Sequence, residues 1–148
     1  MTEKNTIKTS SPDFMCVVTS GILSIKSYHL DEIKLIGKGI KAEGILELAT
    51  SLNWDIDCMA KVLGTTKRSL SHCKNKRLNP KISENAIEVA KLSQFGVEYF
   101  QSIEEWSRWL RTANLRFMGR QPLSFIGSIR GRYLIKSVIQ KQRYGFTA

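Results

Sequence analysis

Apolar residues recur at three- and four-residue spacing along most of this chain, and this periodicity constrains the fold most strongly. Such spacing places side chains on one face of a helix. The clearest stretches lie at 45–52, 86–100 and 133–139. We find no convincing strand, no internal repeat and no low-complexity tract. At 148 residues the chain can bury the core of one or two small helical domains. The sequence therefore predicts an all-α protein.

Capping and turn residues divide the first half of this pattern. A helix is predicted from Ala42, and a second from Ile56 to Leu63 that Gly64 ends. Thr65 or Thr66 can cap a third helix over 67–75. Asn79-Pro80 then breaks the pattern and predicts a domain boundary. We expect an N-terminal arm over 1–29 with at most a brief strand, one domain over 30–80 and a second over 81–148.

The second half predicts four more helical segments. Residues 86–100 carry a broad apolar stripe that is typical of a buried central helix. Ser102-x-x-Glu105 forms a capping box at the start of the next helix. Pro122 suits the first turn of a short helix through Ile126. The last helix, which Gly145 ends, has a predicted apolar face of Tyr133, Leu134, Ile135, Val138 and Ile139.

The charge is unevenly distributed. The formal net charge is +10, and residues 106–148 contain nine Lys or Arg and no Asp or Glu. This excess favours, in that order, nucleic acid, an anionic pocket on another protein, or a membrane surface as partner. The chain has no run of 18 apolar residues, and its N-terminus lacks the pattern of a signal peptide. We therefore expect a cytoplasmic protein with no membrane segment.

Residues with catalytic or metal-binding chemistry are sparse. Cys16, Cys58 and Cys73 are odd in number and lack CxxC spacing, which favours buried free thiols over a disulfide framework or a zinc site. The two histidines have no recognisable nucleophile beside them. Gly39 and Gly44 have the spacing of a phosphate-binding loop, but the required lysine and hydroxyl are missing. We expect no enzyme, no metal and no cofactor.

The stretch from 56 to 75 has the spacing of a helix-turn-helix motif. Ala60 lies where two helices would cross, Gly64 lies in the turn, and Leu70 and Cys73 are expected to face the core. Residues 58–83 contain seven Lys or Arg and no acid, as a phosphate-contacting surface requires. The alternative is a helical hairpin with a solvated basic face. The predicted DNA-contacting residues are Thr66, Lys67, Arg68, Ser71, His72, Lys74, Lys76 and Arg77.

From residue 56 to the end, the order of several short elements resembles the Xre/MbcA/ParS-like family of toxin-binding antitoxins. Arg68-Ser69-Leu70 is similar to the core of the family's recognition helix, although His72-Cys73 stands where a pair of arginines is usual. The other matching elements are Ser83-Glu84, Trp109-Leu110 with Ala113-Asn114, Gly119-Arg120-Gln121-Pro122-Leu123, Gly131, and the terminal Tyr144-Gly145-Phe146-Thr147-Ala148.

The resemblance implies an N-terminal Xre-like helix-turn-helix domain followed by a helical toxin-binding domain. The implied partner is a RES-domain toxin that acts on NAD, whose active site the antitoxin's C-terminal end occludes. A homodimer within the toxin–antitoxin complex and binding to operator DNA, with repression of its own operon, are also implied. The residues assigned to the toxin are Arg120, Lys141, Arg143, Tyr144, Gly145, Phe146 and Ala148.

Two alternatives to this interpretation stay open at the level of sequence. Tyr144 can instead pack on the last helix as a core residue, with Arg143 simply solvated. The whole chain can instead be a stand-alone helix-turn-helix transcription regulator whose C-terminal helices serve dimerisation or ligand binding.

Overall fold

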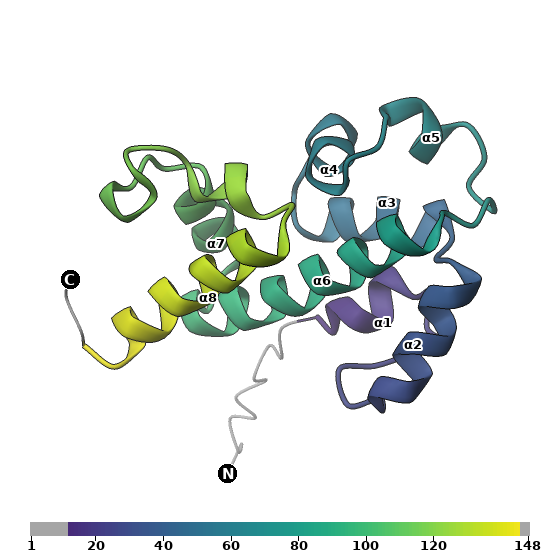
Figure 1. The fold of residues 1–148 in the computed structure, drawn as a ribbon, viewed down its shortest axis with the longest axis horizontal. Coiled ribbons are helices and arrows are strands. Elements are labelled where there is room, and N and C mark those ends of the chain that lie inside the picture. The colour runs from purple at the N-terminus through teal and green to yellow at the C-terminus, as the bar shows by residue number, and fades with distance from the viewer. Residues whose placement is uncertain (1–11, 146–148) are drawn as a thin grey trace, which may run out of the picture.

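The computed structural model of the protein describes residues 12–145, and over this range every regular element is helical (Figure 1). The all-α prediction is therefore confirmed for these residues, and none of their helices is long and apolar enough to cross a membrane. The elements in chain order are α1 (Phe14–Val18), α2 (His29–Lys38), α3 (Ala42–Ser51), α4 (Ile56–Leu63), α5 (Lys67–Ser71), α6 (Pro80–Phe100), α7 (Ile103–Leu110), the 3₁₀ turns η1 (Leu115–Phe117) and η2 (Pro122–Phe125), and α8 (Ile129–Arg143).

The long helix α6 is the centre of the fold. Asn79 caps it by accepting a hydrogen bond from the Ile82 amide at 2.9 Å, and Pro80 lies in the first turn, where no N–H is needed. Its apolar side chains at 86–92 are buried, as the stripe predicted. Helix α6 packs against α1, α2 and α4, which precede it in the sequence, and against α7 and α8, which follow it (Figure 1).

Residues 12–28 differ from the predicted arm. Phe14, Met15 and Val18 of α1 are almost fully buried, and α1 packs on α3 and α6. The side chain of Gln94 accepts a hydrogen bond from the Phe14 amide at 3.0 Å. Gly44 in α3 has no room for a Cβ, because the Val18 carbonyl lies against it. The cluster of apolar residues from Phe14 to Val18 is visible in the sequence, but five residues are too few to show a helical period. The cluster alone therefore does not place this segment in the core.

The predicted boundary at Asn79-Pro80 coincides with the start of a helix that contacts both halves of the chain. Buried apolar residues from both halves form one continuous cluster. Across the boundary, the Ser107 hydroxyl donates to the Leu52 carbonyl at 3.1 Å. The Val62 carbonyl also lies where a Cβ on Gly127 would be. The two predicted domains are thus packed against each other through α6 and through these contacts.

The C-terminal half is built around aromatic rings. Ser102 caps α7 by accepting from the Glu105 amide at 3.2 Å, which places Trp106 and Trp109 on one face. Their rings stack at a centroid distance of 5.9 Å, and Phe100, Phe117 and Phe125 extend the cluster. A Cβ on Gly96 of α6 would fall on the Trp106 ring, so glycine is required there for close approach.

Helix α8 begins and packs differently from its prediction. Ser128 caps it by accepting from the Gly131 amide at 3.0 Å, so Gly131, which the family resemblance places just before the last helix, lies inside its first turn. Ile135, Val138 and Ile139 are buried as predicted. Two residues of the predicted face are exposed instead, Tyr133 at 75% and Leu134 at 38%. Helix α8 packs mainly on α6 and η2, and within residues 12–145 these two side chains lie outside that packing.

Candidate functional site

The predicted DNA-contacting surface is formed by α4, α5 and the turn that follows α5. Asp55 caps α4 by accepting from the Cys58 amide at 2.7 Å, and Gly64 ends it with a φ of 72°. Thr66 caps α5 by accepting from the Ser69 amide at 3.1 Å. Ala60 and Leu70 are buried between the helices. All eight predicted DNA-contacting residues are exposed: Thr66, Lys67, Arg68, Ser71, His72, Lys74, Lys76 and Arg77.

Helix α5 is shorter than predicted, because it ends at Ser71 and His72 forms its C-cap. Cys73 therefore lies in the following turn and is exposed, so the prediction that it faces the core is wrong. The turn itself is fixed by backbone contacts. The Ala42 and Glu43 amides donate to the carbonyls of Lys76 and Lys74, each at 2.9 Å. These contacts hold the basic side chains of the turn next to α5.

Two of these cations have neighbours within the chain. The Arg77 guanidinium donates to the Gly39 carbonyl at 2.8 Å, and the Lys67 ammonium lies 4.0 Å from the Asp57 carboxylate. Both members of the second pair are well exposed, so the contact contributes little to stability. The other three cations of the group, Arg68, Lys74 and Lys76, are exposed to solvent. The exposed cations of this group thus lie on α5 and the turn that follows it, with Asp57 of α4 beside Lys67.

The cysteines are free, as expected, but they are not buried as a set. Cys16 and Cys73 are exposed and Cys58 is half-buried. Burial raises the pKa of the Cys58 thiol, while its interaction with Arg111 lowers the pKa in part. No group of cysteine, histidine and acidic side chains suited to a metal ion exists within residues 12–145.

A tight loop between α7 and η2 presents Arg120. The Asn114 amide donates to the Arg120 carbonyl at 3.1 Å and the Gly119 amide to the Asn114 carbonyl at 3.0 Å, which closes the loop. Gly119 has a φ of 75°, a conformation that favours glycine. The Arg120 guanidinium lies 5.0 Å above the ring of Phe125, so a cation–π contact directs an otherwise exposed side chain. The Gly-Arg-x-Pro-Leu element thus exposes Gly119 and Arg120, whereas its Pro122 is buried.

The same loop exposes two apolar residues that the sequence did not single out. Leu115 is 93% exposed and Met118 is 90% exposed. Met118 has a φ of 57°, so the loop turns sharply just before Gly119 and keeps its side chain outside the core. Large apolar side chains with this exposure are typical of binding surfaces when several occur together. The sequence did contain an indication of this exposure, because neither Leu115 nor Met118 lies on a predicted apolar helix face.

The end of α8 carries the other described toxin-binding candidates. Lys141, Arg143 and Gly145 are exposed, and Tyr144 is 71% exposed. Gly145 has a φ of 74° and ends the helix, as predicted. The interpretation of Tyr144 as a core residue is therefore wrong. Phe146 and Ala148 lie outside the described residues. Figure 1 shows the end of α8 and the 114–120 loop at the part of the molecule away from α5.

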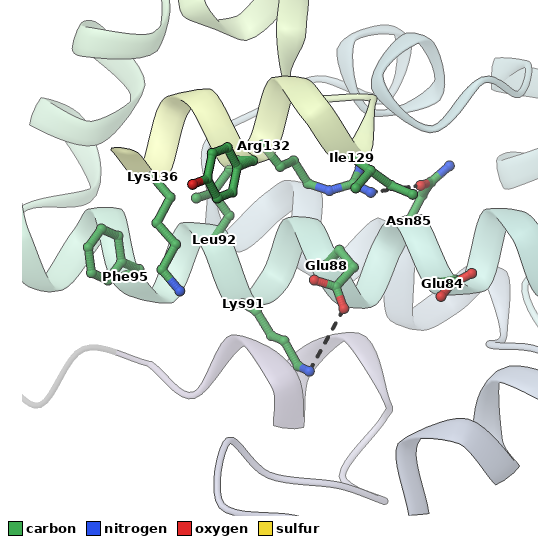
Figure 2. Close-up of a pocket in the computed structure, with 10 residues that line it drawn as sticks. Glu84, Asn85, Glu88, Lys91, Leu92, Phe95, Ile129, Arg132 and Lys136 are labelled. Atoms are coloured by element: carbon green, nitrogen blue, oxygen red, sulfur yellow. Dashed lines mark hydrogen bonds and ion pairs between the residues drawn. The ribbon is translucent and has the colours of Figure 1, made fainter. Parts of the chain in front are cut away.

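A groove between α6 and α8 was not anticipated from the sequence (Figure 2). Its volume is about 390 Å³. Arg132 is buried beside it and donates to the Ile126 carbonyl and to the Asn85 side chain, both at 3.2 Å. Burial lowers the pKa of this guanidinium, whereas Glu88 and Glu84 act to raise it. The carboxylates that interact with the Arg132 guanidinium thus come from α6, because residues 106–148 contain no Asp or Glu.

Comparison with known proteins identifies the C-terminal part. Residues 96–145 match the family of the antitoxin Xre/MbcA/ParS C-terminal toxin-binding domain. The matched range starts near the end of α6 and includes α7, both 3₁₀ turns and α8, but not α4 or α5. No curated protein matches the chain. The match covers about a third of the sequence, and it contains the Arg120 loop, the groove-forming face of α8 and the exposed end of that helix.

Proposed function

We propose that this chain neutralises a cognate RES-domain toxin in the cytoplasm. Residues 96–145 match the C-terminal toxin-binding domain of the Xre/MbcA/ParS antitoxins, whose role is binding and not catalysis. The observation that carries the proposal is the agreement between the matched range and the exposed cationic end of the molecule. Every described residue assigned to the toxin lies between Arg120 and Gly145, within residues 96–145. The toxin-binding match favours this function over a stand-alone transcription regulator.

The chemistry of this end suits a cleft built for a dinucleotide. Lys141 and Arg143 are free to form charge-assisted hydrogen bonds with carboxylates of the toxin. Tyr144 stands exposed where its ring can occupy space that accepts an aromatic base. The terminal carboxylate of Ala148 can take the place of a phosphate. In this proposal the last residues enter the toxin's active site, and the Arg120 loop and its exposed Leu115 and Met118 bind the surface around it.

We further propose that the basic surface of α4 and α5 binds operator DNA and represses the operon. The support is the exposure of all eight predicted contact residues, next to two capped helices that meet at the buried Ala60 and Leu70. Reading paired half-sites then calls for a homodimer. Gly64 at the turn between the two helices also supports this arrangement.

The test is removal of the last five residues, Tyr144 to Ala148, from the full chain. The chain and the product of its adjacent gene are co-expressed, and growth, cellular NAD and co-purification are measured. We expect the intact chain to restore growth and NAD. The truncated chain should lose at least about tenfold in inhibition, which corresponds to about 1.4 kcal/mol of binding free energy.

Two controls separate the parts of this proposal. Arg68→Ala should leave neutralisation unchanged, because Arg68 lies on the basic surface outside the matched range. The truncated chain should still bind operator DNA. A truncated chain that neutralises as well as the intact one would contradict active-site occlusion by the C-terminal end. A harmless neighbour that does not co-purify would contradict the proposed RES partner.

A further inference from the structure

We propose that Lys38, Lys41 and Lys81 form a second phosphate-contacting patch, which binds the sugar–phosphate backbone of DNA beside the contacts made by α5. We call these three residues the lysine patch. They come from the end of α2, the start of α3 and the start of α6, so none of them belongs to α4 or α5. The inference rests on the proposed DNA binding and adds to it residues that the sequence did not single out.

Backbone contacts bring the segment between α2 and α3 against the turn that follows α5. The Leu78 amide donates to the Ile40 carbonyl at 2.9 Å, and Lys41 pairs with Arg77 in an isolated antiparallel bridge. A Cβ on Gly39 would collide with the Leu78 carbonyl, so the two segments touch directly at this glycine. Segments that are far apart in the sequence therefore lie side by side, next to the predicted DNA-contacting turn.

Two side chains fix this arrangement. The Arg77 guanidinium donates to the Gly39 carbonyl at 2.8 Å, so it holds the segment that carries Lys41. The Ile40 amide donates to the buried Ser83 hydroxyl at 2.9 Å, which ties the same segment to the first turns of α6. Figure 1 shows the end of α2 and the starts of α3 and α6 at the same edge of the molecule as the turn after α5. The lysine patch is thus assembled before any partner binds.

The charges of the lysine patch are not neutralised within the chain. Lys38 and Lys81 are exposed, and Lys41 is half-buried. Within residues 12–145 none of the three forms an ion pair. The apolar residues of the two joined segments, Ile40 and Leu78, are buried. This edge therefore presents cations without large apolar side chains, which suits a phosphate backbone better than the surface of another protein.

The lysine patch continues the predicted DNA-contacting surface in one direction only. It begins next to Lys76, whose carbonyl accepts from the Ala42 amide at 2.9 Å. Along α3 the surface ends, because Glu43 and Glu47 line a hollow together with Lys74. Cations thus extend from the turn toward α2 and α6 and are bounded by acids along α3. Such an edge beside α5 can hold the phosphates while α5 contacts the bases, and phosphate contacts of this kind fix the register of a protein on DNA.

The experiment measures fluorescence anisotropy of a labelled, mixed-sequence DNA duplex with the full chain at several salt concentrations. Phosphate contacts do not depend on base sequence, so this probe reports them directly. The variants are Lys38→Ala with Lys41→Ala, and separately Lys81→Ala. We expect each lost contact to reduce the slope of log affinity against log salt by about 0.9, so the double variant should lose about twice as much as Lys81→Ala.

Two control variants separate a local contact from net charge. Lys38→Arg with Lys41→Arg keeps both cations and should preserve the slope. Lys26→Ala with Lys34→Ala removes the same charge from exposed positions on α2 and the loop before it, and should leave the slope nearly unchanged. Circular dichroism checks that every variant is folded. If this second control lowers the slope as much as the patch variant, net charge explains the result and the lysine patch is wrong.

The remaining outcomes distinguish this inference from the proposed function. If Arg68→Ala lowers the slope and the patch variants do not, the lysine patch is wrong and the proposed DNA binding stands. If the patch variants weaken toxin binding but leave DNA binding intact, the patch belongs to the toxin and the inference is overturned. An intact chain that binds no DNA at low salt overturns the lysine patch and the proposed DNA binding together. The proposed neutralisation of a toxin is unaffected, because it depends on residues 96–145.

Discussion

The two candidate binding surfaces differ in what they expose. The surface over α4, α5 and the following turn exposes Lys, Arg, Ser, Thr and His, and within the described residues 56–78 no large apolar side chain is strongly exposed. The C-terminal surface also exposes cations, but among them lie Leu115, Met118, Ile129, Tyr133 and Tyr144. Charge alone suits a phosphate backbone, whereas charge interleaved with apolar side chains suits a protein. The two surfaces therefore suit the two different kinds of partner that we propose, DNA for the first and a toxin protein for the second.

The largest expected effect is the loss of stability that Gly96→Ala causes in the aromatic cluster of the C-terminal half. The added Cβ would fall on the buried Trp106 ring, so the aromatic cluster must shift. We expect a loss of about 1–3 kcal/mol in the free energy of unfolding, as for overpacked cores. Chemical denaturation followed by tryptophan fluorescence measures this loss. Gly37→Ala is the matched control, because nothing lies near a Cβ there. Equal stability of the two variants would contradict the close approach of α6 and α7.

Next in size is the effect of Leu115→Ser and Met118→Ser on toxin binding. Both side chains are about nine-tenths exposed, so stability should be unchanged. If they contact the toxin, the double variant should weaken its binding roughly tenfold, which corresponds to about 1.4 kcal/mol. Titration calorimetry with the toxin measures the affinity. Unchanged toxin affinity, or an equal loss of DNA affinity, would remove the distinction between the two surfaces.

A smaller effect is expected from Arg68→Ala on DNA binding. Removing one phosphate contact should weaken binding and reduce the slope of log affinity against log salt by about 0.9. Fluorescence anisotropy with operator DNA at several salt concentrations measures this slope. Lys141→Ala is the matched control, because it removes one exposed cation from the C-terminal surface. A slope that is flat for the intact chain would exclude phosphate contacts as the source of affinity.

The smallest effect concerns the thiols. The pKa of Cys58 is raised by burial, so at a given pH a smaller fraction of it is thiolate. Its alkylation should be slower than that of the exposed Cys16 and Cys73 and should accelerate only at higher pH. Mass spectrometry of the native protein during alkylation with iodoacetamide resolves the three sites. If Cys58 reacts fastest, the half-buried position described for it is wrong.

The candidate site was predictable from sequence where its residues act locally. The cap at Thr66, the capping box that begins at Ser102 and the glycine turn at Gly64 depend on hydrogen bonds and backbone angles within a few residues. The helical period accounts for the exposure of Lys67, Arg68 and Ser71 on α5. The exposure of Lys74, Lys76 and Arg77 comes instead from the turn that follows α5. The exposed Leu115 and Met118 were missed because their position depends on how the loop closes between Asn114 and Arg120.

The sequence by itself determined the helical class, most helix bounds and the acid-free cationic end, because propensity, capping and charge are properties of neighbouring residues. The tertiary structure alone decided that α1 belongs to the core and that Tyr133 is exposed while Ile135 is buried. It also decided that Glu84 of α6 and Lys136 of α8 line one groove. These outcomes depend on which helices pack together, and contacts between residues about 50 positions apart leave no local pattern in the chain.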